Sequence, residues 1–298
     1  KGGQAVSTIG DKCLTLDDWA LQRALYDAET ACLDDRIGKF VTELKKRGIY
    51  DDTVFIVTGD HGDVLGEQVY YAYHSQNGVW DATCKTPLVV RYPKLFKPGT
   101  RCNELVQIND VFPTLMQICG VKDKAATQSI QGESLLAALK GPVREFALIE
   151  AQRAVHVMRR GWAEAENPDT LDVRFANVWF KAARTKRYKY VWASNGQDML
   201  FDIVRDPDER WNIIDRRPDI AKKLYRALET KLMSIEQRYF MDLFKPTNVH
   251  RHPPRVVRRL QAWGFYQSGI VEPWDENKQV EWERKNKPQP HRRRRAKK

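Results

Sequence analysis

A short apolar run that ends in a tight polar turn constrains this chain more than any other stretch. Residues 54–57 are rich in β-branched side chains and predict a short buried strand, and Asp60 and His61 follow it among closely spaced glycines. In open α/β sheets, ligands bind beyond the carboxyl ends of strands, and glycines let the backbone approach a bound group. A carboxylate beside an imidazole suits a divalent cation, so the stretch predicts a metal site. Taken alone, an Asp-His-Gly triplet would favour the alternative, a turn that Asp60 caps with His61 as an ordinary polar loop residue.

The basic charge of the chain is concentrated in its last residues. The 298 residues carry a formal net charge of +11, and residues 245–298 hold 15 Lys or Arg against 5 Asp or Glu. The first 244 residues are nearly neutral, so the basicity belongs to a tail and not to the body of the chain. With 42% hydrophobic residues, the chain can form one large domain or two smaller ones. No window approaches the roughly 18 uninterrupted apolar residues of a membrane-spanning helix.

The cysteines indicate neither a zinc site nor a disulfide framework. Their number is odd and no two are spaced as Cys-x-x-Cys, so we expect reduced and partly buried thiols. They are Cys13, Cys32, Cys84, Cys102 and Cys119. Because Lys1 is not an initiator methionine and no signal peptide is visible, we expect a processed or truncated start and leave the compartment open.

Hydrophobic periodicity and turn residues predict the main elements. A helix is expected from about Leu16 to Gly48, with Thr15 or Asp17 as its cap. Asn109 or Asp110 is expected to cap a second helix that ends at about residue 120. Short strands are predicted at 88–90, 146–149, 178–183, 188–192 and 199–203, and a further helix at about 218–239. The last three strands, with tight turns between them, predict a small antiparallel sheet.

Several motifs in a fixed order make residues 16–240 resemble the sulfatase family of the alkaline phosphatase superfamily. They are the apolar strand with Thr-Gly-Asp-His-Gly-Asp-Val-Leu-Gly-Glu at 58–67, a Pro-Leu-Val-Val strand at 87–90, Asp-Val-Phe-Pro-Thr-Leu at 110–115, and Arg-Thr-Lys-Arg-Tyr-Lys-Tyr at 184–190 with Asp-Pro-Asp-Glu at 206–209. The resemblance implies an α/β fold: a partial alkaline-phosphatase-like mixed sheet flanked by helices. We accordingly expect residues 1–150 to be the C-terminal part of the catalytic domain. Residues 151–244 would form an antiparallel sheet and helix subdomain, and residues 245–298 a basic Pro/Arg-rich extension.

The resemblance also implies roles for four side chains. Asp60 and His61 fall on the positions of family metal ligands, and a hydrogen bond to the nucleophile or the leaving oxygen is an alternative role for His61. His74 is the basic residue nearest to the position that contacts the sulfate group or protonates the leaving alcohol, with an exposed loop histidine as the alternative. Lys85 takes the position of a family arginine and is either substrate-binding or structural.

The chemistry that the resemblance implies needs more than these residues. Family members hydrolyse sulfate esters with a divalent metal, commonly Ca²⁺ (Mn²⁺, Zn²⁺ or Mg²⁺ being alternatives), and a formylglycine made from Cys or Ser in a Cys/Ser-x-Pro-x-Arg motif. These 298 residues contain no such motif, and no Asp-Asp pair follows an N-terminal strand. We therefore expect the N-terminal half of the same enzyme to supply the nucleophile and the remaining ligands. The isolated chain is expected to be inactive, because a hard cation usually takes six or more oxygen ligands.

Three functions remain open at this point. The first is hydrolysis of a small sulfate ester or a carbohydrate sulfate. The second is a phosphodiesterase or phosphonate monoester hydrolase of the same superfamily, which would share the Asp-His-Gly site. The third is a non-catalytic sulfatase-like protein whose basic tail contacts a polyanion, although that tail could equally serve only solubility.

Overall fold

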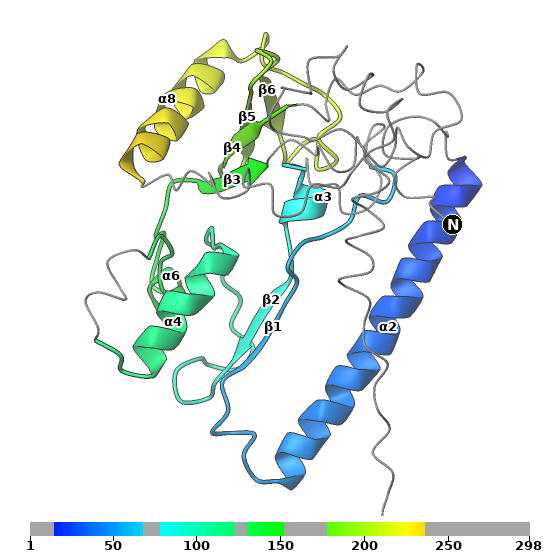
Figure 1. Cartoon of the computed structure of the whole chain (residues 1–298), viewed down its shortest axis with the longest axis vertical. Coiled ribbons are helices and arrows are strands. Elements are labelled where there is room, and N and C mark those ends of the chain that lie inside the picture. The colour runs from blue at the N-terminus through cyan, green and yellow to red at the C-terminus, as the bar shows by residue number, and fades with distance from the viewer. Residues whose placement is uncertain (1–14, 68–77, 123–129, 152–177, 236–298) are drawn as a thin grey trace, which may run out of the picture. The chain divides into compact units, whose positions relative to one another are not determined.

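The computed structural model of the chain describes residues 15–67, 78–122, 130–151 and 178–235 (Figure 1). The chain divides into one unit of Lys1–Glu236 and a second of Gln237–Lys298, which lies outside the described residues. The predicted basic extension therefore also lies outside them. Within the described part of the chain, no helix has the length and apolarity needed to cross a bilayer.

The first described element is the long helix α2 (Leu16–Lys46). Thr15 and Asp18 form a capping box in which each side chain accepts a hydrogen bond from the other residue's backbone N–H. The helix ends at Arg47, and Gly48 follows with φ at 69°, a conformation that favours glycine. The predicted helix and its cap at Thr15 are confirmed, because both signals are local.

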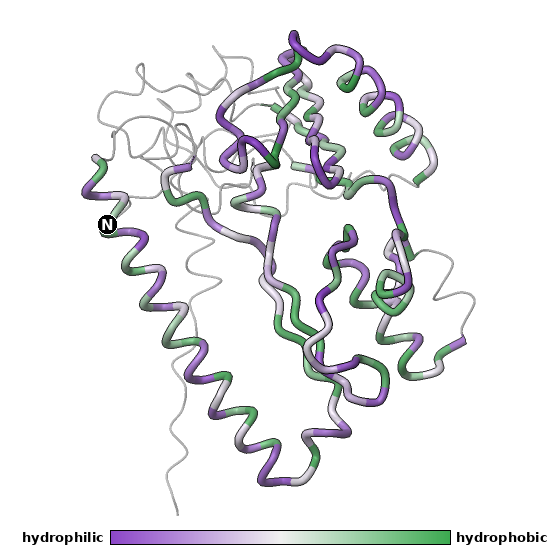
Figure 2. The backbone as a smooth tube through the Cα atoms, turned by 180° about the vertical axis from the view of Figure 1, so that it is seen from behind, coloured by the Kyte–Doolittle hydropathy of each residue, from purple (hydrophilic) through white to green (hydrophobic). Residues whose placement is uncertain are grey.

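Little of α2 is buried, although apolar residues recur along its length (Figure 2). Leu44 is its one buried residue, and Leu33 is 58% exposed. The helix touches the first strand through Phe40, whose ring stacks on Phe55 at 6.2 Å. Near its start, Trp19 lies against Gly66 in the turn after that strand. A large apolar surface of α2 is therefore left uncovered between these two contacts.

Strands β1 (Phe55–Thr58) and β2 (Leu88–Arg91) pair antiparallel, with Thr58 opposite Leu88. The predicted strand is confirmed, but its predicted burial is wrong, because β1 is half-buried along most of its length and exposed at Thr58. Among the described residues, β2 is the one strand that pairs with β1. A strand is buried on both faces only where other layers cover it. The burial of β1 therefore could not be predicted from its own residues.

The segment after β2 holds a short 3-10 helix η1 (Ile108–Asp110), the helix α4 (Val111–Ile118) and the short helix α6 (Leu135–Ala138). Asp110 was expected as a candidate cap for α4, but its side chain makes no capping hydrogen bond there. Its fully buried carboxylate instead accepts two hydrogen bonds at 2.5 Å from Arg144. The pair joins α4 to the chain just before the next strand.

The second sheet has four antiparallel strands, β3 (Ala147–Ala151), β4 (Phe180–Arg184), β5 (Tyr188–Ala193) and β6 (Met199–Asp202), in that order. The three predicted C-terminal strands are thus confirmed as one antiparallel sheet. β3 adds a fourth strand and pairs with β4 over its whole length. This strand falls almost wholly within residues 1–150, which the sequence predicts as the preceding domain, because strand pairing across a long connection leaves no local signal in the sequence.

Both faces of the four-stranded sheet are covered. Helix α8 (Pro218–Ser234) packs Leu224 and Leu228 against Tyr190 and Leu200 on one face. The other face forms a second apolar cluster, which includes three residues from the region between β1 and β2: Val64, Val79 and Trp80. Trp80 meets Phe201 of β6 edge to face at 5.7 Å. The polar turn after β1 is therefore built directly against the C-terminal sheet.

Candidate functional site

The predicted metal ligands lie side by side in the turn directly after β1. The backbone N–H of His61 donates to Asp60 Oδ1 at 3.0 Å, which holds the carboxylate beside the ring. His61 Nδ1 lies 3.0 Å from the carbonyl oxygen of Gly62. Because a carbonyl only accepts, Nδ1 is the protonated nitrogen in a neutral ring, and Nε2 then carries the lone pair.

These two side chains fit part of the donor set of a divalent cation. His61 Nε2 lies 3.7 Å from Asp60 Oδ2, a separation that two ligands of one cation can have, since metal–ligand distances run from about 2.0 to about 2.6 Å. The Asp60 side chain is 89% exposed and that of His61 47% exposed, so both reach open space. Within the described residues, no cluster of three or more His, Cys, Asp or Glu could hold a metal. The turn therefore offers two exposed donors to a cation, and the described residues supply no third His, Cys, Asp or Glu beside them.

The backbone behind this turn is fixed by close packing. Gly62 N–H donates to the carbonyl of Thr83 at 2.7 Å, and a Cβ added at Gly62 would lie 2.1 Å from the carbonyl oxygen of Ala82. Farther along, Gly66 has φ at 104° and lies against Trp19 of α2. Glycine at both places lets the turn lie directly on neighbouring parts of the protein, whereas the role predicted from the sequence was close approach of the backbone to a bound group.

The neighbour that meets Gly62 is the single-turn helix α3 (Asp81–Cys84). Lys85 follows it, is exposed, and donates its backbone N–H to Asp81 O at 2.8 Å. Thr86 lies 3.5 Å from the point where a Cβ of Gly59 would stand, so the end of α3 adjoins the end of β1. Lys85 is thus placed at the same end of β1 as the Asp60–His61 turn. His74 lies outside the described residues.

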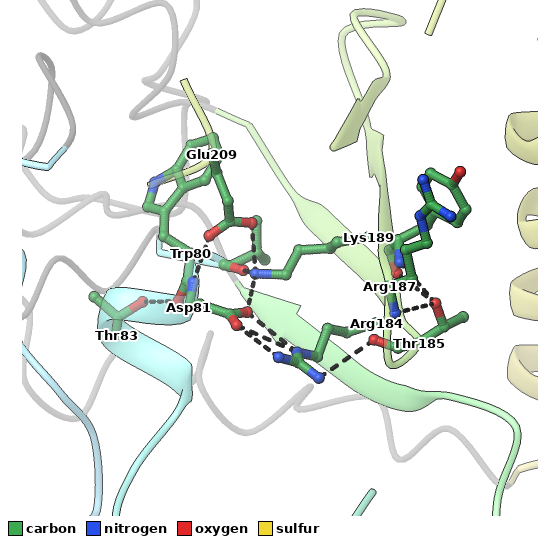
Figure 3. A network of polar contacts seen from close by, with 10 residues as sticks. Trp80, Asp81, Thr83, Arg184, Thr185, Arg187, Lys189 and Glu209 are labelled. Atoms are coloured by element: carbon green, nitrogen blue, oxygen red, sulfur yellow. Dashed lines mark hydrogen bonds and ion pairs between the residues drawn. The ribbon is translucent and has the colours of Figure 1, made fainter. Parts of the chain in front are cut away.

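A buried polar network holds α3 against the C-terminal sheet (Figure 3). Lys189 of β5 is fully buried, and its Nζ lies 2.6 Å from Asp81 Oδ1, 2.6 Å from Glu209 Oε1 and 2.9 Å from the carbonyl of Val79. Arg184 of β4 reaches the other oxygen of Asp81 at 2.8 Å. Glu209 Oε2 also accepts the backbone N–H of Asp81 at 2.6 Å.

The acids of this network differ in how their proton affinity is set. Burial favours the neutral form of Asp81, but hydrogen bonds and charges from Arg184 and Lys189 outweigh it and hold the pKa at about 2. Burial raises the pKa of Glu209 above its ordinary value, against the attraction of Lys189. Burial also raises the pKa of the Cys84 thiol at the end of α3, which makes that thiol a poor nucleophile.

This network was not predicted from the sequence, although the pattern of β5 contains one signal for it. Residues that alternate along β5 share a face, and this places Lys189 with Val191 and Ala193, all of which are buried. A lysine on an apolar strand face requires buried partners. Two of its partners, Asp81 and Glu209, lie 128 residues apart in the sequence, so only the fold identifies them.

A cavity of about 420 Å³ lies elsewhere, lined by Lys45, Gly48, Tyr50, Asp51 and Arg91. It is at the opposite end of the two-stranded sheet, since Arg91 pairs with Phe55 at the start of β1. Its lining includes neither Asp60 nor His61, so it is separate from the candidate metal site.

Comparison with known proteins links the chain to one family. Residues 7–121 match the Sulfatase family model. The chain is 27% identical over 208 residues to an ulvan-active sulfatase from Formosa agariphila. This alignment covers 70% of this chain and 37% of the relative. This chain therefore spans less than half of the length of such curated relatives, from 35% to 44%.

Two solved structures show the same fold. One is a protein in complex with its substrate D-glucosamine-2-N,6-O-disulfate, with a TM-score of 0.55, 24% identity, and coverage of 68% of this chain and 39% of that chain. The other is the phosphonate monoester hydrolase of Agrobacterium radiobacter, with a TM-score of 0.56, 25% identity, and coverage of 74% of this chain and 42% of that chain. The described elements are therefore part of an alkaline-phosphatase-like α/β fold.

Proposed function

We propose that this chain, whose residues 7–121 match the Sulfatase family model, is the C-terminal part of a metal-dependent enzyme that hydrolyses a sulfate ester. The observation that supports this most is the turn of Asp60 and His61. It lies within the matched residues, and its two donors face each other at a separation that suits one cation.

In this proposal each side chain has a stated task. Asp60 holds the cation through its carboxylate. His61 holds it through Nε2, because Nδ1 donates its proton to the carbonyl oxygen of Gly62. The cation, Ca²⁺ with Mn²⁺, Zn²⁺ or Mg²⁺ as alternatives, would polarise the ester when bound. Lys85 contributes positive charge near the anionic substrate, and His74 contacts the anionic group or protonates the leaving alcohol. The formylglycine nucleophile would come from the N-terminal half.

Two features of the described residues support a missing half. The apolar side chains Tyr26, Leu33 and Phe40 recur at seven-residue spacing on one face of α2, and all three are exposed. The strands β1 and β2 are only half-buried. A further part of the same enzyme that covers these surfaces would also bring the remaining ligands to the open side of Asp60.

The substrate class is proposed as a small sulfate ester or a carbohydrate sulfate. The relative described as ulvan-active and the neighbour bound to glucosamine disulfate motivate the choice of test substrates. A phosphonate monoester hydrolase or phosphodiesterase is the second candidate, since a phosphonate monoester hydrolase shares the fold with a TM-score of 0.56. A sulfatase-like binding protein without catalysis is the third.

The test is an assay of the full-length gene product that contains this chain, with matured nucleophile and added metal. Nitrophenyl sulfate, glucosamine disulfate, bis-nitrophenyl phosphate and a phenyl phosphonate ester are compared, and Asp60→Asn is measured beside a control, Lys39→Met, which removes only an exposed ion pair with Asp35. We expect a sulfate ester to be the best substrate, with activity lost in Asp60→Asn and kept in the control. Preference for a phosphorus ester selects the second candidate, and no cleavage of any substrate selects the third.

A further inference from the structure

The buried lysine of β5 has contacts that reach the candidate metal site. The ammonium of Lys189 has three N–H donors, and three oxygens surround it: those of Asp81, Glu209 and Val79. Two of these belong to the start of α3 or the residues just before it. Figure 3 shows the Lys189 side chain extending from the strand to α3, between Glu209 and Asp81.

The start of α3 is held at several points at once. One carboxylate oxygen of Asp81 pairs with the ammonium of Lys189 and the other with the guanidinium of Arg184. The backbone N–H of Asp81 donates a hydrogen bond to Glu209. Each of these contacts has a direction, so together they fix both the position of α3 and its rotation about its own axis. The apolar cluster of Trp80 with Phe201 adds attraction between the same parts but has little directional preference.

The end of α3 in turn holds the metal-site turn. Thr83 O accepts the Gly62 N–H at 2.7 Å, and Ala82 O occupies the space that a Cβ of Gly62 would need. Gly62 is the residue after His61, and its carbonyl also contacts His61 Nδ1. A shift of α3 would therefore move the backbone group that orients the imidazole ring.

We propose that Lys189 is a positioning residue for the candidate metal site: through Asp81 and Glu209 it fixes α3, and through α3 it fixes the Gly62 backbone that orients His61. The C-terminal sheet then sets the geometry of a site whose ligands lie more than a hundred residues earlier in the chain. The link from Lys189 to Gly62 runs entirely through contacts among the described residues of this chain, and its meaning for catalysis rests on the function proposed above.

The test uses the intact 298-residue chain and two local reporters. The first is the hydrogen-exchange rate of the Gly62 amide, measured against amides in α8. The second is the rate at which iodoacetamide alkylates half-buried Cys84, measured by mass spectrometry against exposed Cys119. The variant is Lys189→Met, and the matched control is Lys181→Met on the neighbouring strand, whose partner is the exposed Glu150.

In Lys189→Met we expect both reporters to accelerate by about tenfold or more relative to their references, because hydrogen bonds to charged groups are lost. The control is expected to leave both unchanged. Equal acceleration in α8 would show general loss of stability, and no acceleration would show that α3 is held without Lys189; either result overturns the proposal.

Where Lys189→Met does not fold, Glu209→Gln replaces it, because the amide keeps an oxygen that can accept the Asp81 N–H while the charge is removed. Faster exchange of the Gly62 amide relative to amides in α8, together with faster alkylation of Cys84 relative to Cys119, supports the proposal. Unchanged rates of both overturn it. Failure of the proposed function has a different readout. If hydrogen exchange at Gly62 accelerates in Lys189→Met, the positioning link is supported. If the magnetic resonance signals of Asp60 and His61 then do not change when Mn²⁺ is added, the metal site is contradicted while the positioning link remains.

Discussion

Gly62 is the residue on which the shape of the site most directly depends. A methyl group there would lie 2.1 Å from the carbonyl oxygen of Ala82, a backbone atom that cannot rotate away. We expect Gly62→Ala to reduce the free energy of unfolding by about 1–3 kcal/mol, because the turn must separate from α3. Urea unfolding followed by circular dichroism measures this.

The matched control is Gly38→Ala in α2, where the added Cβ meets nothing within 4 Å. Alanine there is expected to raise the free energy of unfolding by about 0.5–1 kcal/mol, since glycine weakens a helix interior. A Gly62→Ala variant as stable as the parent would show that the turn does not depend on its contact with α3.

Asp81 makes the stability of the network depend on pH. Its folded-state pKa of about 2 lies below the ordinary 3.8, so the ionised carboxylate stabilises the fold above about pH 4. This contribution is lost as the pH falls from about 4 to about 2. We expect Asp81→Asn to be less stable than the parent at pH 6, with the difference narrowing as the pH falls through this range.

Urea unfolding at several pH values between 6 and 2.5 tests this. Burial of Glu209 raises its pKa, and this acts in the opposite direction, so the comparison is made between two chains that both keep Glu209. A difference between parent and variant that stays constant over the whole range would mean that Asp81 is not held ionised by Arg184 and Lys189.

Helix α8 shows how much a single element contributes to the C-terminal sheet. Leu228 is 2% exposed and packs in the cluster that covers one sheet face. We expect Leu228→Ala to lower the free energy of unfolding by about 2–5 kcal/mol, because it leaves a cavity between the helix and the strands. Met233 on the same helix is 85% exposed, so Met233→Ala is expected to change stability by less than about 0.5 kcal/mol. Equal effects of the two substitutions in thermal unfolding would argue against the packing of α8 on this face.

The elements that the sequence predicted well are those with local signals. Helix α2 begins at its cap Thr15, and the hairpin between β5 and β6 contains Gly196 with φ at 79°. What the sequence could not provide depends on partners far along the chain. The half-buried state of β1, the pairing of β3 with β4 and the partners of Lys189 are all of this kind.

The candidate site divides in the same way. A run of adjacent residues was enough to predict that Asp60 and His61 lie together, because both follow directly on one strand. The support of that turn by α3 and the C-terminal sheet was not predictable, since the contact between Gly62 and Thr83 joins residues from separate segments.

The chain as a whole carries its charge unevenly. Residues 245–298 contain nearly all of the net charge of +11, and we expect them to account for any retention on a polyanion. A version that lacks these residues is expected to elute from heparin at much lower salt than the full chain. Unchanged retention after the deletion would assign polyanion binding to the body of the chain and remove the proposed role of the tail.

The proposed hydrolase function depends on a cation site at the end of β1. Titration of Mn²⁺ into the isotope-labelled chain, followed by nuclear magnetic resonance, tests it most directly, because a bound paramagnetic ion broadens signals close to it. We predict that the amide signals of Asp60, His61 and Gly62 broaden first, at roughly millimolar Mn²⁺ because the ligand set is incomplete, and that Asp60→Asn abolishes this effect. Broadening that begins elsewhere in the chain, or that persists at His61 in Asp60→Asn, would contradict the assignment of these residues as metal ligands.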